Sequence, residues 1–179
     1  MTTALKQILS TILIACAALS QFGCGYGLVG RTSNLPEDIQ KIYVDPLENR
    51  TTRTQVDLYL TQAIVDELVT RRRFEIVKGA SSADAILQGA VTSYIVRPVQ
   101  FGADGRATDY QVIIRCDMEF KRQDGGEVIW DRPQYLFRDD YKLEIGTEGV
   151  VFDPENFLIQ GDLARRFAQT LVIDLLEGF

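Results

Sequence analysis

The sequence predicts an α+β two-layer sandwich, in which a mostly antiparallel or mixed sheet of about four or five strands carries two helices on one face. Residues 110–121 alternate between apolar and polar side chains, which is typical of a strand with one covered face and one wet face. Apolar residues recur every four positions from 56 to 68, as in an amphipathic helix, and a second apolar stripe runs from 163 to 175. We therefore expect both helices to pack on the apolar face of the sheet.

A short strand, a helix and a brief strand open the predicted domain. Residues 39–46 are β-prone and end at a proline. An amphipathic helix is expected over 54–72, with Thr54 as its N-cap. A brief strand over 74–77 and a turn over 79–85 follow. The apolar stripe of this helix consists of Val56, Leu60, Ile64 and Leu68, and it is widened by Tyr59 and Ala63.

Three longer strands come next, joined by two hairpin turns. Residues 86–99 are rich in β-formers, and Pro98 indicates a strand end or an edge strand. An Asp-Gly turn within 102–109 closes the first hairpin. The strand over 110–121 follows, and the turn QDGGE leads into a strand over 128–143.

A second helix is expected to end the chain, so that the element order is β-α-(β)-β-β-β-α. Asp153 and Pro154 have the residue types of a helix cap and a first helical position. The apolar stripe that follows comprises Leu163, Ala164, Phe167, Leu171 and Leu175.

Composition argues against several classes of function. The chain has 179 residues, of which 46% are hydrophobic and 25% are charged, as in one ordinary globular domain. Its net charge of −6 disfavours non-specific binding to nucleic acid. There is no histidine, so the usual general base and the commonest metal ligand are absent. We expect no enzyme, no metal and no separate cofactor.

A carboxylate-dependent hydrolase is the remaining enzyme hypothesis. Asp139, Asp140 and Glu144 lie near predicted strand ends, where paired carboxylates could act as acid and base. Charges at strand ends are more commonly solvated. Cys116 falls on the apolar face of the strand over 110–121, and we expect it to be a buried small hydrophobe.

The first 23 residues have the features of a secretory signal peptide. Lys6 precedes an apolar run of about a dozen residues, which is too short to span a bilayer comfortably. Glycine then precedes Cys24, as in the lipoprotein variant of such signals. The predicted organisation is a signal peptide over 1–23, a lipidated tether over 24–38 and one α+β domain over 39–179.

Cys24 is the preferred attachment site for lipid, and Cys16 is the alternative. Lipoprotein signals usually carry an aliphatic residue three positions before the cysteine. Gln21 occupies this position ahead of Cys24, so the segment LIAC, which ends at Cys16, fits this criterion better. Cleavage at Cys16 would leave an apolar core of only about eight residues. A plain cleaved signal with a free thiol is a third possibility. A lipidated cysteine would carry a diacylglycerol and an N-acyl chain, which together anchor firmly.

Four segments of the mature chain carry a resemblance to a known family. They are GCGYGLVGRTSNLPEDIQKIYVDPLENRT, residues 23–51, then DGRATDYQVII, 104–114, then FRDDY, 137–141, and the terminal LLEGF. In this order they resemble the LptE family of lipopolysaccharide-assembly lipoproteins, and the first segment is similar to the start of that family.

The resemblance implies a non-enzymatic protein anchored in the outer membrane, on the periplasmic side or inside the lumen of a barrel. Members of the family plug the large β-barrel LptD, help it to assemble, and interact with lipopolysaccharide. Because the chain is acidic overall, any contact with this anionic glycolipid must be local. Arg97, Arg106 and Arg115 lie on or between the two central strands and are the candidate contacts with lipid phosphates.

A second family of functions fits the same opening segment. IYVDPLENRT, a helix and then FEIV also resemble the start of periplasmic lipoproteins that regulate peptidoglycan synthases or form subunits of secretion pores. In that case the partner would be a synthase or further copies of the chain, instead of LptD.

Overall fold

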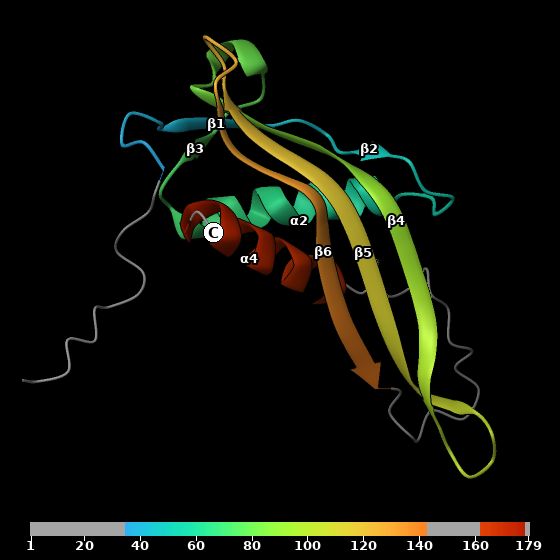
Figure 1. The fold of residues 1–179 in the computed structure, drawn as a ribbon. Helices are drawn as coiled ribbons and strands as arrows, with labels where there is room; N and C mark the ends of the chain where they lie inside the picture. The colour runs from blue at the N-terminus through green and yellow to red at the C-terminus, as the bar shows by residue number, and fades with distance from the viewer. Residues whose placement is uncertain (1–34, 143–161, 178–179) are drawn as a thin grey trace, which may run out of the picture. The chain divides into compact units, whose positions relative to one another are not determined.

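The computed structural model describes residues 35–142 and 162–177, and its described residues belong to one compact unit, Ser33–Phe179. It has the predicted α+β fold (Figure 1). The signal peptide, the tether, and the proposed helix start at Asp153 and Pro154 lie outside the described residues. The elements in chain order are β1 (Lys41–Val44), β2 (Glu48–Asn49), α2 (Val56–Arg71), β3 (Glu75–Ile76), the 3-10 helix η1 (Ala80–Ser82), β4 (Ala85–Phe101), β5 (Ala107–Arg122), β6 (Val128–Lys142) and α4 (Asp162–Glu177).

The strands form one mixed sheet. Its order is β3-β1-β4-β5-β6, and the two-residue strand β2 pairs with β4 off this path. The short strands pair in parallel, whereas β4, β5 and β6 form an antiparallel meander. The sheet thus has six strands instead of four or five. The additional strand, β2, lies in a segment expected to be a loop, since two residues carry no detectable periodicity.

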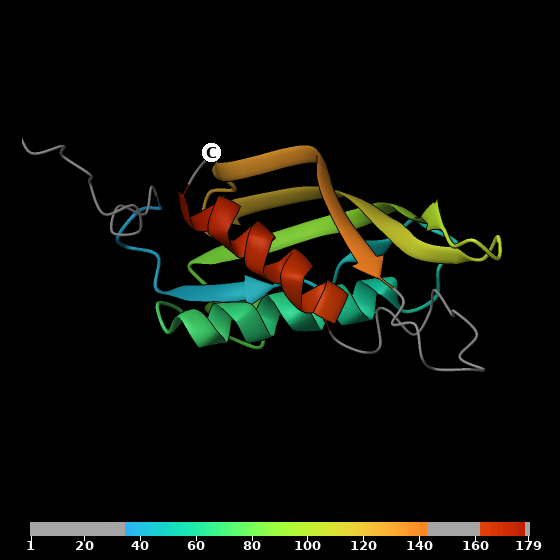
Figure 2. The same ribbon diagram turned by 90° about the horizontal axis from the view of Figure 1, so that it is seen from below.

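Both helices lie against the same face of the sheet, as Figures 1 and 2 show from two directions. The predicted stripe of α2, namely Val56, Leu60, Ile64 and Leu68, is fully buried. The predicted stripe of α4, namely Leu163, Ala164, Phe167, Leu171 and Leu175, is buried as well. These side chains share one apolar core with the even-numbered residues of β5 from Val112 to Phe120. Among the described residues, no helix covers the opposite face of β4, β5 and β6, which we call the outer face.

The start of α2 differs from the prediction. The N-cap position is Gln55, not Thr54, and its left-handed backbone (φ 63°) makes no side-chain cap hydrogen bond. The preceding loop is instead organised by Asn49, whose amide nitrogen donates to the Arg53 carbonyl oxygen at 2.8 Å and to Asp57 Oδ1 at 3.2 Å. The Asn49 side-chain amide thus organises the start of α2 in place of an N-cap side chain, which the sequence spacing does not reveal.

A bulge in β6 decides which side chains reach the outer face. Trp130 and Tyr135 both face the core, although residues five positions apart would lie on opposite faces of a regular strand. The bulge lies between the pairs Met118–Arg132 and Cys116–Tyr135, where β6 has one residue more than β5. Gln134, within this bulge, has a φ of 56°. Beyond the bulge, the even-numbered residues of β6 therefore point to the outer face.

Asp84 ties the beginning of the domain to the start of β4. Its Oδ2 accepts hydrogen bonds from the backbone N–H groups of Gln40 at 2.9 Å and Lys41 at 2.7 Å. These two bonds hold the pKa of the Asp84 carboxyl below its ordinary value of 3.8. A lowered pKa in the folded state means that the charged carboxylate stabilises the fold above pH 3.8, and that this contribution is lost as the pH falls through the folded-state pKa.

Asp84→Asn is therefore expected to lower the free energy of unfolding at neutral pH and to lower it less at an acidic pH below 3.8, where the carboxylate loses part of its stabilising contribution. Urea unfolding at both pH values measures the difference. Asp124→Asn, in the exposed turn before β6, is the matched control. An equal loss at both pH values would show that the charge of Asp84 is not what stabilises this junction.

Candidate functional site

The outer face of β4, β5 and β6 is the candidate functional surface. The register of the three strands places its side chains in cross-strand rows. Three successive rows along the strands are Ser93–Arg115–Leu136, Ile95–Ile113–Arg138 and Arg97–Gln111–Asp140. Residues on either side of these in the sequence, such as Ile114 and Phe137, are buried in the core. The rows therefore belong to the face that is turned away from the helices.

An apolar patch lies in the middle of these rows. Ile95 and Ile113 are directly paired across β4 and β5, and Leu136 is the diagonal neighbour of Ile113 on β6. Ile95 and Leu136 are 42% and 41% exposed, whereas Ile113 is only 7% exposed. We refer to these three side chains as the apolar patch. Large exposed aliphatic side chains that adjoin one another are a feature of binding surfaces.

The three arginines predicted from the sequence are not brought together. Arg97 Nη2 donates to Gln111 Oε1 at 2.6 Å, and Gln111 Nε2 donates to Asp140 Oδ1 at 3.0 Å, so Arg97 belongs to a chain of hydrogen bonds across three strands. Arg106 lies in the β4–β5 turn and is 89% exposed at its side chain. Arg115 shares the outer face with Arg97 but lies two rows away.

Arg138 is a cationic residue of this face that the sequence reasoning missed. It pairs with Ile113, one row from Arg115, so the two arginines are diagonal neighbours on adjacent strands. Its position depends on the β6 bulge, because a regular strand continued from Trp130 would place Arg138 on the core side. Pro133 within a β-rich run is the one sequence signal that could have indicated this bulge.

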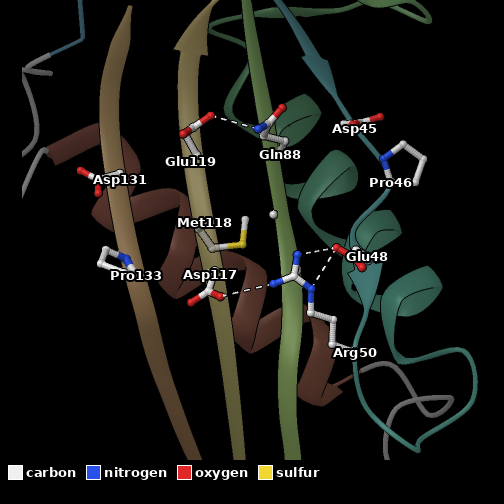
Figure 3. Close-up of a pocket in the computed structure, with 12 residues that line it drawn as sticks. Asp45, Pro46, Glu48, Arg50, Gln88, Asp117, Met118, Glu119, Asp131 and Pro133 are labelled. Carbon is white, nitrogen blue, oxygen red and sulfur yellow. Dashed lines mark hydrogen bonds and ion pairs between the residues drawn. The ribbon is translucent and has the colours of Figure 1, made fainter. Parts of the chain in front are cut away.

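A groove of about 440 Å³ lies at the other end of the outer face, beside β2 (Figure 3). Five carboxylates and one arginine contribute its charges. Arg50 Nη2 lies 2.6 Å from Glu48 Oε2, and Arg50 Nη1 lies 3.9 Å from Asp117 Oδ2. The hydrogen bond from Arg50 holds the pKa of Glu48 below its ordinary value. The charged residues of the groove are Asp45, Glu48, Arg50, Asp117, Glu119 and Asp131.

The outer face is consequently polarised. Its β2 end is anionic, whereas the rows that hold Arg115 and Arg138 are cationic and apolar. Within 35–142 and 162–177, no group of three or more cysteine, aspartate or glutamate side chains is placed to hold a metal ion. The acidic groove therefore disfavours an anionic ligand and lacks the clustering that a metal site needs.

The paired carboxylates of the hydrolase hypothesis are separated by the sheet. Asp139 faces the helix side, where its Oδ2 lies 2.7 Å from Arg166 Nη2 of α4, and Asp140 lies on the outer face. Burial raises the pKa of Asp139 even though Arg166 is close. Two carboxylates on opposite faces cannot share one substrate as acid and base. Glu144 lies outside the described residues.

Of the three cysteines, only Cys116 lies among the described residues. Cys116 is fully buried, as predicted, and burial raises the pKa of its thiol to about 12. A thiol with this pKa is not a nucleophile at neutral pH. Cys16 and Cys24 lie outside the described residues. No helix in the described part of the chain is long and apolar enough to cross a membrane.

Comparison with known proteins identifies relatives of this fold. A family model described as LptE, lipopolysaccharide-assembly, matches residues 39–175. The chain is similar to an uncharacterized lipoprotein B from Nitrosomonas europaea, with 16% identity over 85% of this chain and 90% of that chain and a TM-score of 0.52. It is also similar to a hypothetical protein from Chlamydia trachomatis, with 8% identity over 79% of this chain and 99% of that chain and a TM-score of 0.51.

A weaker structural likeness links the chain to the rare lipoprotein B from Shewanella oneidensis. The identity is 14% over 74% of this chain and 91% of that chain, and the TM-score is 0.48. No curated protein sequence matches the chain. At identities this low the structural likenesses concern the fold alone, whereas the family match spans every strand and nearly all of α4.

Proposed function

Because the chain belongs to the LptE family of lipopolysaccharide-assembly proteins, we propose that it is an outer-membrane lipoprotein that plugs the LptD β-barrel and helps it to assemble. The observation that carries this proposal is the family match over residues 39–175, which includes the six described strands, α2 and nearly all of α4. The family handles lipopolysaccharide without chemical conversion. The separation of Asp139 from Asp140 and the inert Cys116 fit such a role.

The proposed anchor is a lipid on Cys24, with Cys16 as the alternative. A diacylglycerol and an N-acyl chain would hold the protein on the periplasmic side of the outer membrane, while the domain enters the lumen of the barrel. The tether proposed from the sequence, residues 24–38, connects this anchor to the domain.

The outer face is the proposed contact surface for lipopolysaccharide. Lipid phosphates need local cations because the chain carries a net charge of −6. Among the arginines suggested by the sequence, Arg115 is best placed, since its side chain makes no hydrogen bond or ion pair with another described residue. Arg97 is engaged by Gln111, and Arg106 stands apart in the hairpin turn.

Affinity purification tests the partner and the anchor together. We expect the tagged full-length protein, extracted from membranes with detergent, to retain a barrel of the size of LptD. Intact-mass analysis should show an acylated N-terminus at Cys24. A tagged, unrelated outer-membrane lipoprotein is the control for non-specific capture of barrels.

Three other results would contradict the proposal. Recovery of a peptidoglycan synthase would indicate a regulator, and recovery of a ring of identical subunits would indicate a secretion-pore component. An unacylated N-terminus would remove the anchor, because one free thiol gives no membrane affinity.

A further inference from the structure

A run of basic residues ends α2 and continues past β3. Residues 71–78 read RRRFEIVK and hold four basic residues and one acidic residue, although the chain as a whole has a net charge of −6. A cation in the last turn of a helix offsets the helix dipole. Arg71 occupies that turn, and its Nε lies 2.7 Å from Glu67 Oε1. The dipole and this ion pair leave three cations of the run without a role, namely Arg72, Arg73 and Lys78.

These three cations have no counter-charge in the described part of the chain. The side chains of Arg72, Arg73 and Lys78 make no hydrogen bond or ion pair with another described residue, and all three residues are exposed. Arg73 Cζ lies over the ring of the buried Phe74, 5.1 Å from its centroid. A guanidinium group over a ring still carries N–H donors at the edge of its plane, so Arg73 is positioned and able to bind an anion.

Arg72 occupies a backbone position that favours glycine. It is the C-cap residue of α2, its φ is 53°, and its N–H donates to the Val69 carbonyl oxygen at 3.1 Å. This left-handed conformation is unfavourable for a residue with a Cβ and is the usual place for glycine at a helix end. Arginine is thus a poor choice for the backbone here, which is consistent with a function of its side chain.

The chain enters the domain beside this basic run. The Gln40 carbonyl oxygen accepts a hydrogen bond from the Glu75 N–H at 2.8 Å, and Lys41 is the register partner of Glu75. Figures 1 and 2 show the end of α2 and the start of β1 at one end of the domain, and the β4–β5 hairpin at the other. The polypeptide that leads from the proposed anchor at Cys24 therefore joins the domain next to the basic run.

We propose that Arg72, Arg73 and Lys78 form a contact surface for anionic phospholipid headgroups. The membrane leaflet concerned is the one in which the acyl chains on Cys24 are embedded, so the contact is a second membrane signal beside the lipid anchor. This inference rests on the proposed function for that anchor. It adds an orientation, in which the end of α2 is turned toward the leaflet and the β4–β5 hairpin away from it.

The distribution of charge favours this orientation. Basic side chains are attracted to an anionic leaflet within about a Debye length of its surface. The rest of the chain is acidic, and its groove holds carboxylates such as Asp117 and Glu119, so turning the groove toward the leaflet would bring like charges together. Glu75 is the one carboxylate within residues 71–78, and it reduces the positive charge of the run without cancelling it.

Fluorescence quenching on the acylated full-length protein tests the contact. The protein, labelled at Val69→Cys, is reconstituted into vesicles of phosphatidylcholine with or without phosphatidylglycerol. Val69 is in the last turn of α2 and is 54% exposed, whereas Cys116 is buried and does not compete for the label. Phosphatidylcholine with a nitroxide on its headgroup quenches a label at the membrane surface. We expect stronger quenching in vesicles with phosphatidylglycerol, and loss of this difference at high salt.

Arg72→Gly with Arg73→Gln removes two charges from the proposed surface. Glycine suits the φ of Arg72, so this part of the change adds no strain. The ratio of docked to undocked domains should fall by at least about tenfold, since each basic residue near an anionic surface contributes about fivefold. Arg106→Gln with Arg165→Gln is the matched control, because it removes two exposed arginines from the β4–β5 turn and the start of α4. Its quenching should stay within about twofold of the wild type.

A second variant keeps the test valid if the double variant unfolds, which urea unfolding curves reveal. Lys78→Gln lies outside the helix and should lower the ratio of docked to undocked domains by about fivefold. A label in the β4–β5 turn, at Asp104→Cys, should be quenched equally in both kinds of vesicle. Wild-type quenching in the Lys78→Gln variant and in a folded Arg72→Gly, Arg73→Gln variant would overturn the inference.

Flotation with the vesicles distinguishes this inference from the proposed anchor. If the protein floats with both kinds of vesicle and the label at position 69 is quenched equally in both, the inference is wrong and the anchor stands. If the protein does not float with phosphatidylcholine alone, the anchor is wrong. In that case, flotation with phosphatidylglycerol that Arg72→Gly with Arg73→Gln abolishes would support the inference, and no flotation with either kind of vesicle would overturn it.

Discussion

Replacing Phe167 by alanine is expected to lower the free energy of unfolding by about 3–5 kcal/mol, the cost typical of deleting a buried aromatic ring. Phe167 is fully buried in α4. Its ring meets Tyr135 and Phe137 of β6 edge to face, with centroids 6.0 and 5.5 Å away and interplanar angles of 82° and 84°. The change removes both ring contacts between the C-terminal helix and β6, and leaves a cavity between two layers.

Urea unfolding followed by circular dichroism measures this loss. Leu58→Ala is the matched control, because Leu58 lies on the exposed side of α2 and its truncation should cost less than about 0.5 kcal/mol. Equal stability of the Phe167→Ala variant and the wild type would mean that α4 is not docked on β6 in the way described.

Replacing Cys24 by alanine is expected to abolish membrane anchoring. A cysteine thiol is the only side chain to which the diacylglycerol can be attached, and each buried methylene of the acyl chains contributes roughly 0.8 kcal/mol to membrane affinity. The variant should therefore move from the membrane fraction to the soluble periplasmic fraction. Cell fractionation with immunodetection measures this change.

Cys16→Ala is the matched control for the choice of attachment site. If Cys24 carries the lipid, the Cys16→Ala variant remains in the membrane fraction with the mass of the wild-type mature protein. Release of the Cys16→Ala variant together with retention of Cys24→Ala would reverse the assignment. Retention of both variants would show that neither cysteine is the anchor.

Long periodic segments allowed the fold to be predicted from the sequence. The stripe from Val56 to Leu68 and the alternation from Val112 to Phe120 each repeat often enough to specify an element and its buried face. The Asp-Gly turn and the Gly-rich turn indicated where the two hairpins lie. Once these faces were assigned, a single core between the sheet and the two helices followed from the need to bury all of them.

The residues of the outer face could not be predicted in full, because their positions depend on features that leave no local pattern in the sequence. The outer position of Arg138 results from one additional residue in β6, and such a residue inverts every side chain beyond it. The commitment of Arg97 to Gln111 depends on the register between β4 and β5. Thr54 is not the cap because Asn49, seven residues before the start of α2, organises the loop through side-chain hydrogen bonds.

Depletion of the protein in living cells tests whether it is needed to deliver lipopolysaccharide to the cell surface. Lipopolysaccharide exposed at the cell surface would be quantified with a label that cannot cross the outer membrane, before and after depletion. We expect surface lipopolysaccharide to fall while its synthesis continues, and to be restored by the wild-type chain. Unchanged surface lipopolysaccharide, accompanied by a defect in peptidoglycan synthesis or polymer secretion, would contradict the account and favour the regulator or pore alternative.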